Sequence, residues 1–344
     1  MAVTIDVVQV VATEAGPGDD TWFVALCGAG KTGWYGPVNA ETAKYVRERL
    51  ARVVTGEPAD DHRRLHAALC EATLADTTAA ASWAVGALDC AAWDLHAQVA
   101  RQPVAQLLAA SPQFVVPLYA SWLGLDLSLP TAAAEAKRVG DGEWLYTKWG
   151  LRSGAGKGRI VEAARLAATT QAVAATLGVA AAFDAVSTWD ARLADLVAQR
   201  LDRAEVLWLE DPLPTYDLEA HRVLAGRVPL AIGERLLLHG DGEALIGLRP
   251  RALTLDVVAC GGITRAVDLV TAAHARGVVV YPHGRSFVPA VHLAAAFPEA
   301  IPAIEYRLQW EPIRQRKYAC PWQPAQGVIT VPSSPGLGAT PGSR

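Results

Sequence analysis

The spacing of apolar residues along the chain changes near residue 115. Before that point, two short apolar runs at 21–27 and 31–35 flank Gly28-Ala29-Gly30, a pattern that predicts a β-hairpin. Stretches with helical spacing follow at 40–55, 60–73 and 78–99. Pro103 is expected to open one more helical turn. The first 114 residues are therefore predicted to form an α+β domain.

From Val115 onward, short apolar runs recur, and each is followed by a segment with helical spacing. The eight runs are Val115–Ser121, Trp144–Lys148, Val179–Asp184, Val206–Glu210, Pro229–Glu234, Ala252–Asp256, Val278–His283 and Pro302–Glu305. Successive runs end 22 to 36 residues apart, the length that a parallel strand and its crossover helix require. Eight such units predict an α/β chain with a closed (β/α)₈-type barrel. A doubly wound sheet is the alternative, disfavoured because no Gly-rich phosphate turn follows the first strand.

The last 27 residues differ in composition from the barrel region. Residues 318–344 are rich in Pro and Gly and are expected to pack back on the first domain. The predicted organisation is a first domain at 1–114, a barrel at 115–317 and a C-terminal segment at 318–344.

Composition excludes several functional classes. Of the 344 residues, 51% are hydrophobic and 19% charged, so a large core can form. The formal net charge of −4 leaves no basic surplus for a nucleic acid backbone. No basic segment precedes an apolar one at the N-terminus, and the longest apolar region, 79–95, is too short and too polar at Asp89 for a membrane span. The five cysteines are scattered and odd in number, which favours a reducing, cytoplasmic location.

Seven of the eight predicted strands end in an ionisable residue. In chain order these are Lys148, Asp184, Glu210, Glu234, Asp256, His283 and Glu305. In a parallel barrel the carboxyl ends of the strands share one face, where the active sites of this fold lie. We therefore expect these side chains to converge, although a single carboxylate at a strand end more often caps a helix or pairs with Arg.

The carboxylates of three neighbouring strands form a predicted metal site. Asp184, Glu210 and Glu234 would repel one another unless a cation lies among them. Oxygen ligands alone suit a hard divalent ion, Mg²⁺ first and Mn²⁺ second. The sequence therefore predicts a magnesium site at the mouth of the barrel.

Candidate acid–base groups lie on both sides of this site. Lys148 is on one flank, and His283, with Asp256 as partner for one ring nitrogen, is on the other. Glu305 could hydrogen-bond a substrate oxygen, or it could pair with Arg307 two residues later. A divalent cation that neutralises an enediolate, together with a positioned base, permits removal of the proton α to a carboxylate.

Taken together, these residues resemble the mandelate racemase/muconate lactonizing enzyme group of the enolase superfamily, along essentially the whole chain. The matching segments are Thr147-Lys148-Trp149-Gly150, Phe183-Asp184, Trp208-Leu209-Glu210-Asp211-Pro212, Ile232-Gly233-Glu234, Asp256 with Gly261-Gly262-Ile263-Thr264, Pro282-His283, Ala92-Trp93-Asp94-Leu95 and Pro335-Gly336-Leu337-Gly338. The resemblance implies an α+β capping domain over a (β/α)₇β TIM-like barrel, a homo-oligomer, and a small-molecule carboxylate as substrate. It also implies that Asp184, Glu210 and Glu234 bind Mg²⁺ and that Lys148 and His283 are the acid–base pair. Asp256 would then be the partner of His283, and Glu305 would contact the substrate carboxylate.

The chain departs from the family pattern at two positions. Tyr146 stands where the family often has the first Lys of Lys-x-Lys, and Val186 stands where many relatives carry Asn. Residues two apart on a strand share a face, so Tyr146 and Lys148 should both point inward. Without the neighbouring cation, Lys148 is either a base or an electrostatic anchor.

Further residues near the strand ends are candidates for substrate contact. Tyr146 and Trp149 could line the pocket, and Arg152, Arg235 and Arg285 could bind an anion. Ordinary packing or a solvated surface is the competing interpretation for each of them. Substrate choice is expected to depend on the capping domain, including the loop Ala15–Asp20 and the region after Tyr35.

The predicted function is dehydration of an acid sugar to a 2-keto-3-deoxy acid, with His283 as general acid to the departing hydroxyl. The alternative is a racemase or epimerase of a 2-hydroxy acid, in which Lys148 and His283 deliver protons to opposite faces. Cycloisomerisation remains open, and so does a non-catalytic binding barrel that kept only the fold.

Overall fold

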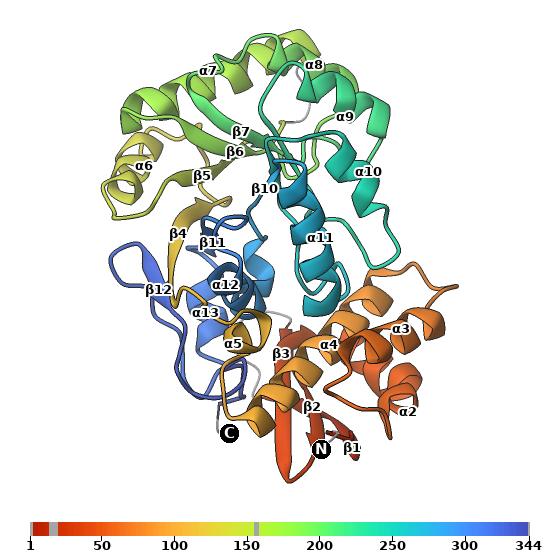
Figure 1. The fold of residues 1–344 in the computed structure, drawn as a ribbon. Coiled ribbons are helices and arrows are strands. Elements are labelled where there is room, and N and C mark those ends of the chain that lie inside the picture. The colour runs from red at the N-terminus through yellow and green to blue at the C-terminus, as the bar shows by residue number, and fades with distance from the viewer. Residues whose placement is uncertain (1–2, 14–19, 155–157, 343–344) are drawn as a thin grey trace.

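A three-stranded antiparallel sheet and a group of helices form the N-terminal part of the molecule, at the bottom of Figure 1. The structure is a computed structural model that describes residues 3–13, 20–154 and 158–342. The strands are β1 (Val7–Ala12), β2 (Asp20–Gly28) and β3 (Lys31–Asn39). The helices are α1 (Ala40–Tyr45), a π-helical turn (Val46–Leu50), α2 (Ala51–Val54), α3 (His62–Ala72), α4 (Ala79–Ala100) and α5 (Val104–Leu108).

The predicted hairpin is confirmed. Strands β2 and β3 pair antiparallel through a turn in which Ala29 and Gly30 have φ of 51° and 69°. Two central residues with positive φ are typical of the type I′ turn, whose twist matches that of the strands. Strand β1 was not predicted. It pairs antiparallel with β2 at the edge of the sheet, where its side chains are only partly buried.

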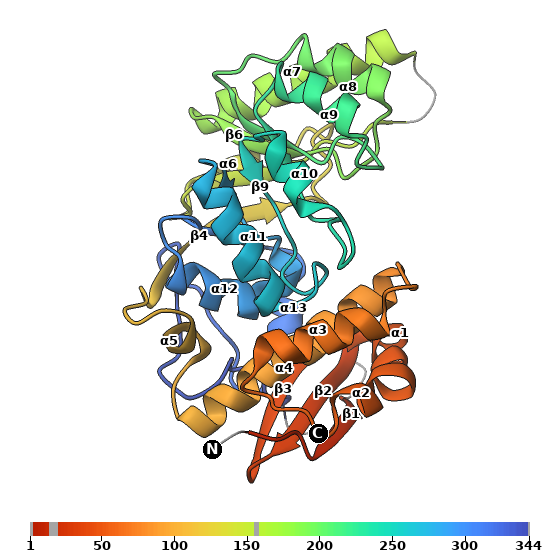
Figure 2. The same cartoon turned by 45° about the vertical axis from the view of Figure 1, so that its right-hand side comes forward.

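Eight parallel strands make up the second part of the molecule and curl into a barrel-like sheet (Figures 1 and 2). They are β4 (Val115–Trp122), β5 (Thr147–Gly150), β6 (Ala181–Asp184), β7 (Val206–Glu210), β8 (Leu230–Ile232), β9 (Ala252–Leu253), β10 (Val279–Val280) and β11 (Ile304–Arg307). Each strand from β4 to β9 pairs with the next one in the chain, and β11 returns to pair with β4. This order confirms the predicted barrel with its cap.

Helices connect the strands and lie outside the sheet (Figure 2). They are α6 (Ala132–Gly140), α7 (Arg159–Leu177), α8 (Ala191–Ala198), α9 (Leu218–Ala225), α10 (Gly242–Gly247), α11 (Ile263–Ala275), a 3₁₀ turn (Gly284–Ser286) and α12 (Phe287–Ala296). Side chains alternate along each strand. In β11, Ile304 and Tyr306 belong to the core under the helices, whereas Glu305 contacts Lys148 inside the barrel.

Several strands are shorter than predicted, β9 and β10 most of all. Strands β9 and β10 have two residues each, so Asp256 and His283 lie three residues beyond their ends. The two segments nevertheless stay side by side, because the backbone N–H of His283 donates to the carbonyl of Leu255 at 3.0 Å. The ionisable residues therefore keep the order around the barrel that the strand pattern predicts.

The cap and the barrel share one hydrophobic core. A single cluster of buried side chains extends from the capping strands and α4 to β8–β11 and α12. Polar contacts cross the same boundary, since buried Asp89 accepts hydrogen bonds from both the N–H and the hydroxyl of Thr264, and Trp93 Nε1 donates to that hydroxyl at 3.0 Å. The cap is therefore fixed against the start of α11.

The C-terminal segment touches both parts of the molecule. It follows α13 (Glu311–Gln315) and contains β12 (Val328–Thr330), which pairs antiparallel with β4. On the cap, Asp94 accepts a hydrogen bond from the N–H of Leu337, and the Tyr318 hydroxyl donates to the carbonyl of Gly36. The domain boundaries at 114 and 317 stay a prediction.

Within residues 3–13, 20–154 and 158–342, no helix has both the length and the hydropathy needed to cross a bilayer.

Candidate active site

Three carboxylates meet at the carboxyl ends of β6, β7 and β8. Asp184 and Glu210 are the last residues of their strands, and Glu234 lies two residues after β8. Each offers an oxygen within 4.8 Å of the other two. Asp184 and Glu210 are buried, while the Glu234 side chain is 25% exposed and so faces the opening.

This cluster fits a hard divalent cation. All the donors are carboxylate oxygens, and Asp184 Oδ2 is buried without a hydrogen-bond partner among the described residues. Burial raises the pKa of Asp184 to about 6 and that of Glu210 to about 8. Negative charge is therefore costly here, and a bound cation would remove that cost.

Lys148 lies inside the barrel against the same carboxylates. Its Nζ donates to Glu210 Oε1 at 2.8 Å and is 2.9 Å from Glu305 Oε1 and 3.4 Å from Asp184 Oδ2. Burial opposes the charged form, but Glu210 and Glu305 hold the pKa of Lys148 well above its usual value. In this arrangement the ammonium group neutralises the acidic cluster.

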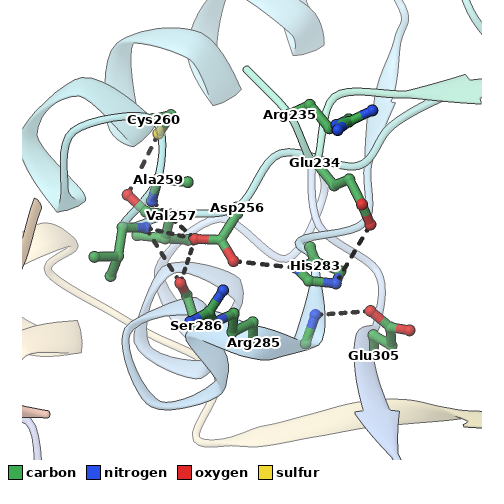
Figure 3. Close-up of polar contacts among 12 residues, drawn as sticks. Glu234, Arg235, Asp256, Val257, Ala259, Cys260, His283, Arg285, Ser286 and Glu305 are labelled. Atoms are coloured by element: carbon green, nitrogen blue, oxygen red, sulfur yellow. Dashed lines mark hydrogen bonds and ion pairs between the residues drawn. The ribbon is translucent and has the colours of Figure 1, made fainter. Parts of the chain in front are cut away.

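His283 lies on the other side of the cluster, between two carboxylates (Figure 3). Its Nδ1 is 3.1 Å from Asp256 Oδ2, and its Nε2 is 3.4 Å from Glu234 Oε2. Burial disfavours the charged ring, but Glu234 and Asp256 raise the pKa of His283. The Asp256 contact fixes the ring so that Nε2 points toward the metal-site carboxylates.

Asp256 is itself held by three donors. Its Oδ1 accepts from the backbone N–H groups of Val258 (3.0 Å) and Ala259 (2.9 Å) and from the hydroxyl of Ser286 (Figure 3). The carboxylate therefore stays ionised and oriented in spite of its burial. Sequence reasoning missed Ser286, although it lies only three residues after His283.

Glu305 contacts Lys148 rather than Arg307. Its Oε1 faces Nζ of Lys148, and its Oε2 accepts from the N–H of Gly284 at 2.7 Å. Burial opposes ionisation, but Lys148 lowers the pKa of Glu305 below its usual value. Lys148 is a partner that the sequence did not predict for Glu305, and it takes the place expected for Arg307.

Four aromatic side chains form the floor of the site. Tyr146, Trp208 and Tyr281 each stand two residues before a residue of the site, and Tyr119 on β4 packs against all three. Since residues two apart share a strand face, these rings lie one layer deeper in the barrel. Trp208 Nε1 also donates to Glu210 Oε2 at 2.9 Å, a contact that the same two-residue spacing could have revealed.

The predicted substrate-contact residues have different positions. Tyr146 belongs to the aromatic floor, beneath Lys148. Trp149 is not brought to the site, because it is buried under the helices outside the sheet, where its Nε1 donates to Thr147. Arg152 is exposed and lines a cavity of about 460 Å³ beside the loops that follow β4 and β5.

Two other predicted arginines have partners within the protein. Arg235 is exposed and donates to the carbonyl of Pro214, and Arg285 stacks on the Trp83 ring at 4.3 Å and pairs with Asp20 at 3.2 Å. Asp20 ends the loop expected to influence substrate choice. The rest of that loop, 15–19, lies outside the described residues.

Comparison with known proteins identifies the family. Residues 131–343 match the family described as "Enolase C-terminal domain-like", and residues 24–109 match "Mandelate racemase / muconate lactonizing enzyme, N-terminal domain". The chain belongs to the mandelate racemase/muconate lactonizing enzyme group of the enolase superfamily. The predicted resemblance is thus confirmed for both parts of the molecule.

Individual relatives are distant. The chain is 28% identical over 222 residues to the L-talarate/galactarate dehydratase of Salmonella typhimurium, a match that covers 62% of this chain and 53% of that protein. The chain therefore spans about half the length of this curated relative. Among solved structures, a mandelate racemase/muconate lactonizing protein from Paracoccus denitrificans in complex with magnesium has a TM-score of 0.84 at 24% identity, with 99% and 96% of the chains covered.

Another solved structure is similar to the same extent. An enolase from Agrobacterium radiobacter with bound Na and L-malate has a TM-score of 0.83 at 24% identity, with 97% and 92% of the chains covered. At these identities, the structural matches establish the fold.

Proposed function

We propose that this protein is a Mg²⁺-dependent enzyme that removes the proton α to a substrate carboxylate and dehydrates an acid sugar to a 2-keto-3-deoxy acid. The observation that carries the proposal is the placement of Lys148 and His283 against different members of one carboxylate cluster. Membership of the family supports it, and so do a curated relative that is a dehydratase and a magnesium-bound structural neighbour. We propose Asp184, Glu210 and Glu234 as the metal ligands.

The bound cation would supply positive charge that stabilises the substrate carboxylate as negative charge develops during proton removal. Lys148, beside Glu210 and Glu305, would take the α-proton at Nζ. A cation bound by Asp184 and Glu210 would weaken the hold of these carboxylates on the ammonium proton, so that the neutral amine can act as the base. Glu305, fixed by the N–H of Gly284, positions the ammonium group. The aromatic floor closes the barrel beneath these residues and excludes water from that side.

His283 is placed to act on the departing hydroxyl. Asp256 binds Nδ1, so Nε2 is the nitrogen that faces the cluster and that gives or takes a proton. A hydroxyl one carbon beyond the reacting carbon would receive that proton and leave as water. In this scheme the dyad supplies the acid step of the elimination.

A racemase or epimerase is the second candidate. Lys148 contacts Asp184 and Glu210, whereas His283 contacts Glu234, so the two groups approach the cluster from different sides. Two groups on opposite faces of a carbon can exchange its configuration. The homo-oligomeric state, the cytoplasmic location and use of Mn²⁺ stay predictions.

One experiment separates these outcomes. The protein is incubated with Mg²⁺ in D₂O and a panel of sugar acids and 2-hydroxy acids, and deuterium at Cα and 2-keto acid are measured. Exchange with a keto product supports dehydration, and exchange with inversion but no keto product supports epimerisation. No exchange with any member of the panel would contradict proton abstraction.

Two variants assign the proton-transfer groups in that assay. Lys148→Ala and His283→Asn are each expected to lower turnover by roughly 10²–10⁴-fold. Lys137→Ala removes an exposed lysine far from the site and serves as the control. Full exchange by Lys148→Ala would show that Lys148 is not the base.

A further inference from the structure

Arg307 is only partly exposed, and it forms no ion pair with any of the described residues. It is the last residue of β11 and, two residues after Glu305, it faces the same side of the strand. No carboxylate of the described residues lies within 4.0 Å of its guanidinium, and its buried Nε has no hydrogen-bond partner. A cation that is partly shielded from water and unpaired is stabilised when an anion reaches it.

Neighbouring arginines have partners that Arg307 lacks. Asp20 is shared by Arg285 at 3.2 Å and Arg314 at 3.2 Å. Both oxygens of Glu305 are occupied by Lys148 and the N–H of Gly284. Glu311 interacts with Arg307 only at longer range: its Oε1 accepts from Gln315, and its Oε2 is buried without a hydrogen-bond partner among the described residues. Arg307 therefore remains available to a ligand.

The side chain is also held in place. Its stem lies against Gly284, where a Cβ would come within 2.9 Å of Arg307 Cγ, and its guanidinium lies 5.3 Å from the ring centroid of Trp310. Gly284 directly follows His283, so the stem passes beside the catalytic histidine. The guanidinium is thus fixed next to the site before any substrate binds.

We propose that Arg307 binds a second carboxylate at the far end of the substrate, so that the enzyme acts on sugar diacids rather than on monoacids. This inference rests on the proposed function, in which the first carboxylate binds at the metal cluster. Residues two apart on a strand, such as Glu305 and Arg307, are separated by about 6.6 Å. The two terminal carbons of an extended six-carbon substrate are a similar distance apart, about 6 Å, given carbon–carbon bonds of about 1.5 Å. A guanidinium fork binds a carboxylate through two parallel hydrogen bonds.

The first arm of the test measures turnover. With Mg²⁺ present, kcat and KM are measured for matched pairs of diacid and monoacid, galactarate with galactonate and glucarate with gluconate. Arg307→Gln is expected to raise KM for the diacid on the order of a hundredfold. Its KM for the monoacid should stay within about threefold of the wild-type value. Arg307→Lys keeps the charge and should retain part of the preference. The control, Arg316→Gln, removes an exposed arginine in the same segment and should change neither value.

The second arm measures binding without turnover. Calorimetry in Mg²⁺ compares 2-hydroxyadipate with 2-hydroxyhexanoate, six-carbon acids that lack the 3-hydroxyl and so cannot be dehydrated. The wild-type protein should bind the diacid more tightly, and Arg307→Gln should abolish the difference.

The outcomes separate the two proposals. If sugar acids are dehydrated and the preference for diacids survives in Arg307→Gln, the role of Arg307 is overturned and the proposed function stands. Equal losses for diacid and monoacid would show that Arg307 only balances the buried charge of Glu311, which also overturns the role. If no sugar acid is turned over but the binding difference depends on Arg307, the dehydratase proposal fails and the diacid site stands. Should Arg307→Gln not fold, Arg307→Lys decides the binding arm.

Discussion

Lys148 and a bound cation should both neutralise the negative charge of the same carboxylates. Their effects on the stability of the folded protein should therefore be coupled, and the coupling can be measured. Without metal, Lys148→Met leaves the acidic cluster with no counter-charge, since Nζ lies 2.8 Å from Glu210, 2.9 Å from Glu305 and 3.4 Å from Asp184. Removing one partner of a buried ion pair destabilises a protein by about 3–5 kcal/mol. We expect a loss of that size in the free energy of unfolding.

The corresponding change in melting temperature follows from the chain length. With about 2.1 cal/mol/K per residue, 344 residues give an unfolding entropy of about 0.7 kcal/mol/K. The variant should therefore melt about 4–7 °C below the wild-type protein in EDTA. In saturating Mg²⁺ the cation neutralises Asp184 and Glu210, so the difference should shrink to half or less.

Calorimetric melting and Mg²⁺ titration test the coupling together. By reciprocity, Lys148→Met should bind Mg²⁺ more tightly than the wild-type protein, about 30-fold if the coupling is about 2 kcal/mol. Lys137→Met, an exposed residue paired with Asp141, should melt within a degree of wild type in both conditions. Equal Mg²⁺-induced shifts in the wild-type protein and Lys148→Met would refute the reasoning, because Lys148 and the cation would then act on different groups.

Three further outcomes are expected. Asp256→Asn should lower turnover by roughly 10²–10⁴-fold and change the pH–rate profile, because His283 loses the acceptor that fixes its ring; an unchanged profile would contradict this. Gly262→Ala should lower the free energy of unfolding in urea by about 3 kcal/mol, because φ is +105° and the new Cβ would lie 2.3 Å from Asp89 Oδ2. The control, Gly247→Ala, places its Cβ in open space and should leave that free energy unchanged. Burial raises the pKa of Asp89 to about 7, so the folded protein holds this proton more tightly than the unfolded chain. The free energy of unfolding should then fall by at most about 4 kcal/mol as pH rises from 3.8 through 7. In melting curves recorded across this pH range, Asp89→Asn should show a smaller dependence of stability on pH.

The site could be placed from the sequence to the extent that it depends on strand order. Each of the seven ionisable residues ends an apolar run, and neighbours in the chain become neighbours in the barrel. Asp184, Glu210 and Glu234 therefore follow three adjacent strands, and their oxygens lie within 4.8 Å of one another. Their assignment as metal ligands still awaits the titration described above.

The substrate-contact residues show where this reasoning fails. Tyr146 directly precedes β5 and Trp149 lies within it, but the first lies in the barrel floor and the second under the outer helices. Alternation along the strand separates the two faces, and the depth of a residue depends on which rings fill the barrel. Tyr119, which packs against Tyr146, comes from another strand.

The sequence by itself determined the barrel, the cap and the order of the charged residues, because hydrophobic periodicity and chain order are local properties. Only the tertiary structure decided which partner each charge takes. Glu305 has Arg307 two residues away but contacts Lys148, 157 positions earlier, and Arg285 pairs with Asp20, 265 positions away. Ion pairs depend on distances of a few ångströms between side chains from different elements, and those distances are set only when the cap, the barrel and the C-terminal segment pack together.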